Sequence, residues 1–137
     1  MKQKFLLLSC FLMFSGILFS QQNPWTKFNR TSIENPRERS VTPDQFKLLK
    51  LNTEMIGQQL IQAPQRNQNS TSGIPIRIPN EEGGFDTFIV SEASVMHPDL
   101  QAKYPDIRSF FGYKSDDPST KIRFSLSPYF GLNATIR

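Results

Sequence analysis

From residue 74 to the end of the chain, apolar side chains recur at every second position in short runs separated by turn-forming residues. The first run reads Ile-Pro-Ile-Arg-Ile-Pro over residues 74–79, so its isoleucines lie on one face of an extended strand. Short links between such runs favour hairpin connections, because a parallel crossover needs about a dozen residues or more. The pattern therefore predicts a mostly antiparallel β-sheet over residues 74–137.

Turn residues divide this segment further. Asn80–Gly84 and Ser115–Pro118 are predicted turns. We expect strands over residues 74–79, 85–94, 107–113, 122–126 and 130–137, and a short helix over residues 97–104 that Pro105 closes. Two prolines place the first strand at an edge of the sheet. The last strand reaches Arg137 without a turn or a polar tail, which predicts that the sheet is incomplete and that the chain is the front of a longer protein.

A helix is expected before the sheet. Thr42-Pro43-Asp44 combines a capping residue, a proline suited to the first helical position and an acid that favours the helix N-terminus. Apolar residues then recur near a period of 3.6, and Pro64 stops the pattern. The members of this stripe are Phe46, Leu49, Ile56 and Leu60. The predicted fold class is therefore α+β, with one N-terminal amphipathic helix over residues 43–63, followed by the antiparallel sheet with a short helix inserted.

Two polar segments flank the predicted helix. Residues 21–42 contain Pro24 and Pro36 and have an apolar anchor at Trp25 and Phe28, so we expect an extended arm that docks through Trp25. Residues 64–73 are rich in Gln, Asn and Ser and are predicted to be a flexible linker.

The first 20 residues have the pattern of an export signal. Lys2 and Lys4 precede an apolar run from Phe5 to Phe19, and Ser20 is a small residue at a plausible cleavage point. The run is shorter than the roughly 20 residues of a membrane span, so we expect cleavage and a secreted or periplasmic product with no membrane attachment. Lipidation at Cys10 is the alternative, and it is disfavoured because the apolar run continues past that cysteine.

Removal of residues 1–20 from the 137 leaves 117 residues without cysteine, which excludes a disulfide, a thiolate zinc site and a cysteine nucleophile from this part. The formal charge falls from +4 to +2, because two lysines leave with the signal. The basic residues are scattered along the sequence and are not interleaved with aromatic residues. This distribution predicts a solvated surface and no nucleic-acid partner.

Few polar residues are candidates for chemistry. His97 is the single histidine, and zinc needs three or four ligands, so we expect it to lie at the entry of the short helix. Asp116-Asp117 could bind calcium, but the following Pro118 favours a turn. Glu81-Glu82 is an adjacent pair at a hairpin tip and not a spaced acid–base pair. The residues therefore predict no catalytic, cofactor-binding or metal site.

The aromatic cluster Phe110, Phe111 and Tyr113 could stack on a sugar or a peptide, although a strand with rings on both faces explains it as well. Asn133-Ala134-Thr135 matches the glycosylation sequon. A stand-alone exported module that binds peptide or sugar is one hypothesis for function. A small hydrolase is a weaker one, because no nucleophile–base pair supports it.

Several stretches of the second half occur together in a known family: Ile76–Asn80 with Gly83-Gly84, Phe85–Phe88, Glu92–Ile107, Asp117-Pro118 and Ile122–Ser125. Together they resemble the N-terminal pro-region of large secreted reprolysin-like zinc metalloproteases (metzincins) of Gram-negative bacteria. Many of these precursors carry a C-terminal sorting domain for type IX secretion. The resemblance covers about half of the chain.

The resemblance implies a signal peptide and a partial prodomain that helps a downstream catalytic domain fold and inhibits it. In the family, the histidines of a His-Glu-x-x-His-x-x-Gly-x-x-His helix hold the zinc and its Glu is the general base. Nothing in this chain matches that motif, so no catalytic residue is transferred, and zinc is expected only in the downstream domain. Inhibition by a cysteine thiolate, used by some metzincin prodomains, is excluded within residues 21–137.

Overall fold

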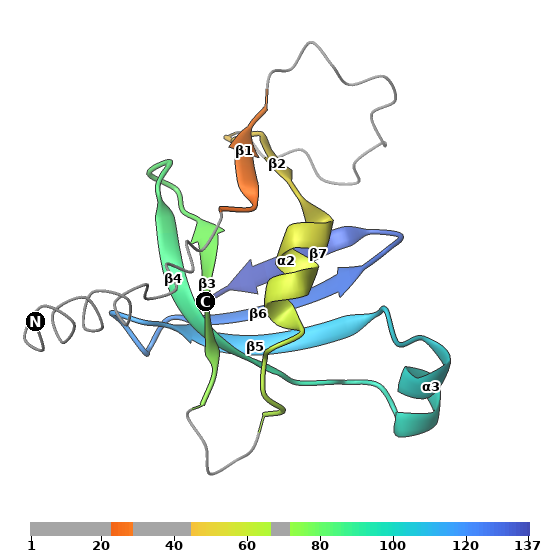
Figure 1. Cartoon of the computed structure of the whole chain (residues 1–137). Coiled ribbons are helices and arrows are strands. Elements are labelled where there is room, and N and C mark those ends of the chain that lie inside the picture. Colours follow the sequence, from red (N-terminus) through yellow and green to blue (C-terminus); the bar gives the residue numbers. More distant parts are fainter. Residues whose placement is uncertain (1–22, 29–44, 67–71) are drawn as a thin grey trace, which may run out of the picture.

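The computed structural model of the chain describes residues 23–28, 45–66 and 72–137. The predicted signal over residues 1–20 and most of the arm therefore lie outside the described residues. The elements in chain order are β1 (Trp25–Lys27), β2 (Leu49–Leu51), α2 (Thr53–Leu60), β3 (Ile74–Pro79), β4 (Phe85–Glu92), α3 (Pro98–Lys103), β5 (Arg108–Lys114), β6 (Lys121–Ser127) and β7 (Gly131–Ile136) (Figure 1).

The second half of the chain forms a five-stranded antiparallel meander in the order β3-β4-β5-β6-β7. This confirms the predicted antiparallel sheet, its five strands and the short helix between the second and third of them. Gly83 has a φ of 92° in the turn between β3 and β4, a conformation that glycine adopts without steric cost. The side chain of Asn80 closes the same turn by accepting a hydrogen bond from the backbone N–H of Gly84.

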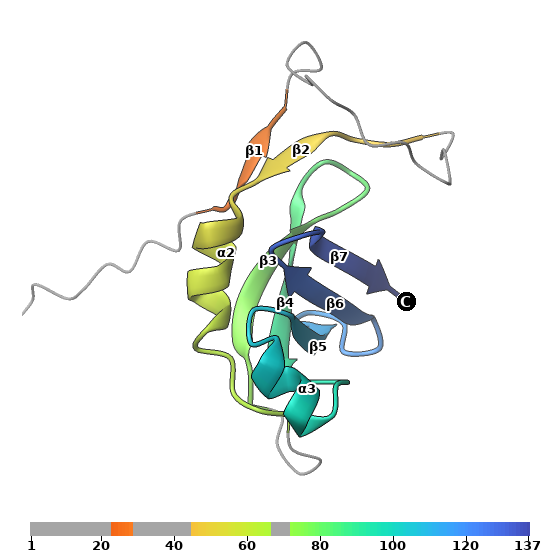
Figure 2. The ribbon, with the colours of Figure 1, turned by 90° about the vertical axis from the view of Figure 1, so that its right-hand side faces the viewer.

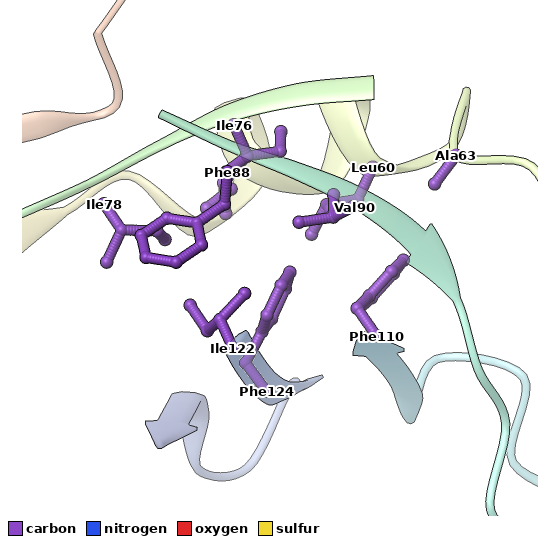
Figure 3. Close-up of a cluster of buried hydrophobic side chains, with 10 residues drawn as sticks. Leu60, Ala63, Ile76, Ile78, Phe88, Val90, Phe110, Ile122 and Phe124 are labelled. Atoms are coloured by element: carbon purple, nitrogen blue, oxygen red, sulfur yellow. The ribbon is translucent and has the colours of Figure 1, made fainter. Parts of the chain in front are cut away.

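The core lies between one face of this sheet, called the inner face, and helix α2 (Figures 2 and 3). Ile56 and Leu60 of α2 are fully buried, as are Phe88 and Val90 of β4 and Ile122 of β6. The rings of Phe110 and Phe124 stack at 4.9 Å between centroids across β5 and β6. Apolar residues at alternate strand positions thus meet one face of one short helix.

The predicted helix over residues 43–63 is wrong in its first part. Residues 45–52 are not helical: Leu49–Leu51 is strand β2, and α2 starts only at Thr53. The side chain of Asn52 caps the helix by accepting from the backbone N–H of Met55. Residues 43–44 lie outside the described residues. The correct start signal is therefore this asparagine, and the residues before it pair with a strand from the arm.

Strands β1 and β2 form a separate two-stranded antiparallel sheet at one end of α2. Trp25, the predicted anchor of the arm, packs against the core and donates a hydrogen bond from Nε1 to the backbone carbonyl of Arg77 at 2.8 Å. The arm is thus joined to β2 by its backbone and to β3 by its tryptophan.

The first residues of the predicted linker over residues 64–73 are hydrogen-bonded to the end of β4. The backbone N–H of Glu92 donates to Pro64, and the N–H of Arg66 donates to the carbonyl of Glu92, at 2.8 Å and 2.7 Å. Gln65 forms a parallel bridge with the same residue. Polar composition suggested a solvated segment, but unpaired backbone groups at the end of β4 bind it like a short extra strand. Residues 67–71 lie outside the described residues.

Candidate functional site

The stretch that carries the family resemblance, Glu92–Ile107, forms the connection from β4 through α3 to β5, and its polar side chains bond within it. Ser94 donates from Oγ to the side-chain oxygen of Gln101. The amide nitrogen of Gln101 in turn donates to the carbonyls of Tyr104 and Ile107, at 3.3 Å and 3.0 Å. These residues therefore hold a long loop in one conformation, which gives their pattern a structural explanation.

At the base of this connection Glu92 and Arg108 form a bidentate ion pair on the inner face. The Nε and Nη2 atoms of Arg108 donate to the two carboxylate oxygens at 2.9 Å and 2.7 Å, and Gln65 Nε2 donates to one of them at 2.8 Å. The side chain of Glu92 is 11% exposed and that of Arg108 is 23% exposed. The hydrogen bonding of Arg108 to the carboxylate of Glu92, which accepts from it, raises the pKa of Arg108 above its ordinary value, so the guanidinium keeps its positive charge.

Arg108 lines an open groove of about 1240 Å³ beside α2. One wall is the exposed side of the helix, including Glu54, Gln58 and Ile61. The rest of the lining comes from the start of β3, the loop before β5, β5 itself, and the end of β6 with the turn after it. The residues contributed by these parts are Ile74, Pro75, Pro105, Asp106, Arg108, Phe110, Leu126 and Pro128. The groove is therefore mainly apolar, with a fixed guanidinium at one side.

Apolar side chains continue from this groove along β7. Leu132 pairs with Leu126 and packs against the core, so both lie on the inner face. Ala134 and Ile136 follow at alternate positions of the same face and are exposed, Ile136 by 45%. Helix α2 thus covers the inner face near the start of β7, and the inner face is exposed to solvent near the end of β7.

The predicted structural role of His97 is consistent with its position. The residue caps α3, and its Nδ1 accepts from the backbone N–H of Asp99 at 3.4 Å. Within residues 23–28, 45–66 and 72–137, no group of three or more His, Cys, Asp or Glu side chains is placed to hold a metal ion.

The acidic candidates lie in turns. Asp117 accepts hydrogen bonds from the hydroxyls of Ser119 and Thr120 and from the N–H of Ser119, and these bonds lower the pKa of its carboxyl. Asp116 is 72% exposed near Lys114. Glu81 and Glu82 are exposed at the hairpin tip, as predicted, and Lys47 donates to the backbone carbonyl of Glu81.

The structure does not bring the three aromatic candidates together. Phe110 is 2% exposed and belongs to the core on the inner face, whereas Phe111 and Tyr113 project from the opposite, outer face of the sheet. Asn133 of the sequon lies exposed on β7. A binding platform made of all three rings is therefore excluded by the alternation of the strand.

Sequence reasoning missed the groove and the ion pair of Glu92 with Arg108. The residues of this pair are separated by a helix and two loops, and only the register between β4 and β5 brings them together. The signal available in the sequence was Glu92 near the end of one predicted strand and Arg108 near the start of the next, both at positions on the inner face.

Comparison with protein-family models, with curated proteins and with solved structures gave no match. Among the described parts of the chain, no helix has the length and apolar composition needed to cross a membrane.

Proposed function

We propose that this chain is the N-terminal, non-catalytic part of the precursor of a secreted reprolysin-like zinc metalloprotease. Residues 1–20 direct export, and the domain that follows is the first part of a prodomain. It helps the downstream protease domain of the same precursor to fold and covers the catalytic cleft until it is removed. The zinc and its histidine ligands belong to that downstream domain.

The observation that carries this proposal is the exposed apolar surface formed by the groove and the end of β7. Contiguous exposed apolar surface on a soluble domain marks a site of protein interaction. Ile61 on one side of the groove is 62% exposed, and Ile136 at the end of β7 is 45% exposed. Burying these side chains against a protein partner would remove them from water, with about 25 cal/mol gained per Å².

The resemblance supplies the identity of the partner. Its most specific stretch, Glu92–Ile107, ends one residue before Arg108, which lines the groove. The same residues that match the family pattern therefore position one wall of the proposed contact surface. This agreement supports a prodomain more than it supports a hydrolase, because the matching side chains hold the loop rather than converge on a reacting group.

The gene provides the first test. The reading frame is expected to continue past codon 137 and to encode a His-Glu-x-x-His-x-x-Gly-x-x-His motif downstream. A frame that closes without such a motif would reject the precursor and would leave a stand-alone exported module for peptide or sugar as the better hypothesis.

Binding to the protease domain provides the second test. The Ile61→Asp variant is expected to bind the separately purified protease domain of this precursor at least about tenfold more weakly than the parent chain, because the interface would bury an unpaired carboxylate. Isothermal titration calorimetry measures the affinity, and inhibition of peptide cleavage gives an independent readout.

The matched control is Val95→Asp. Val95 is 74% exposed, in the connection between β4 and α3, and does not line the groove. The Val95→Asp variant introduces the same charge at an apolar surface position outside the groove. Its affinity for the protease domain should therefore equal that of the parent chain. Equal weakening by both variants would contradict the assignment of the groove as the contact surface.

A further inference from the structure

The two faces of the five-stranded sheet differ sharply in charge. On the inner face, Asp86 of β4 pairs with Lys114 at 3.3 Å, and Glu92 at the other end of β4 pairs with Arg108. These are the acidic residues of strands β3 to β7, and each faces a base. The charges on the inner face are therefore balanced by pairs.

The outer face carries only positive charge. Its outward strand positions, fixed by the register, are 75, 77 and 79 of β3, 85, 87, 89 and 91 of β4, 109, 111 and 113 of β5, 121, 123, 125 and 127 of β6, and 131, 133 and 135 of β7. None of these described positions holds Asp or Glu, whereas Arg77, Lys121 and Arg123 are among them. Arg137 is hydrogen-bonded opposite Lys121. The neighbouring acids Asp116 and Asp117 stand in the turn at one end.

Two arginines converge on one ring of this face. The guanidinium of Arg66 lies 4.0 Å from the centroid of the Phe111 ring, and that of Arg123 lies 5.4 Å from it. Arg77 lies 5.0 Å from the ring of Phe85 on the same face. Basic residues that are scattered in the sequence thus lie beside aromatic rings on this face, because the sheet brings distant segments together.

The position of each guanidinium over a ring leaves hydrogen-bond donors for a carboxylate. A guanidinium is attracted to a ring without using its N–H groups in a hydrogen bond to the protein, and two of these groups can bind one carboxylate. Within the described residues, neither Arg66 nor Arg123 donates a side-chain hydrogen bond or forms an ion pair. Both side chains are exposed, so these donors are accessible to an anion.

We propose that the outer face binds an extended acidic polypeptide segment with carboxylates at alternate positions. Lys121 and Arg123 stand two residues apart on β6, which separates them by about 7 Å, and side chains on one face of an extended peptide have the same spacing. Recognition of nucleic acid is disfavoured, because single-stranded binding relies on bases that stack on open rings, and guanidiniums occupy the Phe111 ring. This inference concerns the opposite face from the proposed protease contact and does not depend on it.

The test uses the whole purified chain and a fluorescent peptide of about twelve residues in which Glu alternates with Thr, a length that spans the sheet. We expect binding at low salt that weakens steadily as salt is added. The Arg66→Glu/Arg123→Glu double variant should bind at least about tenfold more weakly, because it replaces two attractive charges by two repulsive ones. Both arginines are exposed, and circular dichroism checks that the variant folds.

The matched control is Lys50→Glu/Lys103→Glu, which changes the net charge equally at exposed positions of β2 and α3. Its affinity should stay within twofold of the parent. Equal loss in both double variants would show a general charge effect and overturn the proposal. So would absence of binding at low salt, or tighter binding of single-stranded DNA or a sulfated polysaccharide than of the peptide. If the first variant does not fold, Arg66→Gln/Arg123→Gln replaces it and should weaken binding at least threefold.

Discussion

The Glu92→Ala variant is expected to lose about 3 kcal/mol of its free energy of unfolding, the lower end of the range for breaking a buried ion pair. The carboxylate accepts hydrogen bonds from Arg108 and Gln65 and is 11% exposed. Its removal leaves the guanidinium of Arg108, whose side chain is 23% exposed, without a counter-charge. Urea unfolding followed by circular dichroism measures the change.

Asp86→Ala is the control for this variant, because it breaks the other ion pair between β4 and β5. The side chains of Asp86 and Lys114 are 26% and 25% exposed, and their closest charged atoms are 3.3 Å apart. Asp86 also accepts a hydrogen bond from Asn80 Nδ2 at 3.1 Å. Its ion pair with Lys114 is longer and more exposed to solvent, so that pair should be worth about 1 kcal/mol or less. Equal losses of unfolding free energy in the two variants would contradict the expectation that burial and bidentate geometry make the Glu92 ion pair the more stabilising of the two.

A third variant tests whether Glu92 stabilises the chain through its ion pair with Arg108. An Arg108→Met variant retains much of the stem but leaves the carboxylate of Glu92, which is 11% exposed, without its counter-charge, so its loss should be comparable to that of Glu92→Ala. The double variant should then be more stable than the sum of the two single losses predicts, since the unpaired guanidinium is gone. A purely additive result would show that Glu92 stabilises the chain through Gln65 and the backbone and not through Arg108.

The sheet was predictable from sequence because its signals are local. Each strand alternates its apolar residues, as Ile122 and Phe124 do in β6, and each short link contains turn residues such as Asn80 or Pro118. Because a one-residue slip would reverse inner and outer faces, this alternation also fixes the register. Strand bounds and the antiparallel order follow from the same information.

The start of the helix was not predictable in this way. Leu49 and Leu51 fit both a helical stripe and a short strand, and the choice depends on pairing with Trp25–Lys27, which comes from a segment far back in the chain. A local pattern contains no information about that partner. Asn52 was the decisive residue, since its side-chain oxygen satisfies the N–H of Met55 at the helix start.

The charged surfaces were also beyond a sequence-based prediction. Arg66 comes from a predicted linker and Arg123 from a strand, and they meet at Phe111 only because the segment after α2 is hydrogen-bonded to Glu92. Composition correctly gave the small net charge. It could not show that the acids of the sheet lie on the inner face and the unpaired bases on the outer face.

The Phe88→Ala variant should show the largest loss of stability of a single substitution proposed for this chain. Phe88 is fully buried at the centre of β4, between α2 and the neighbouring strands (Figure 3). Truncating a buried phenylalanine to alanine typically costs about 3–5 kcal/mol, because the apolar surface is lost and a cavity remains. Thermal and urea unfolding should both show the loss, and a marginally stable domain would be unfolded at room temperature.

The control is Phe85→Ala in the same strand. Phe85 projects from the outer face, is half-buried and contacts the guanidinium of Arg77. Its truncation removes partly solvated surface and one exposed cation–π contact, worth about 0.5–1 kcal/mol, and leaves no internal cavity. The two variants thus remove the same kind of ring from opposite faces of one strand. A loss for Phe85→Ala as large as that for Phe88→Ala would mean that the outer face is also buried in solution, which would contradict both the assigned core and the proposed acidic-peptide surface.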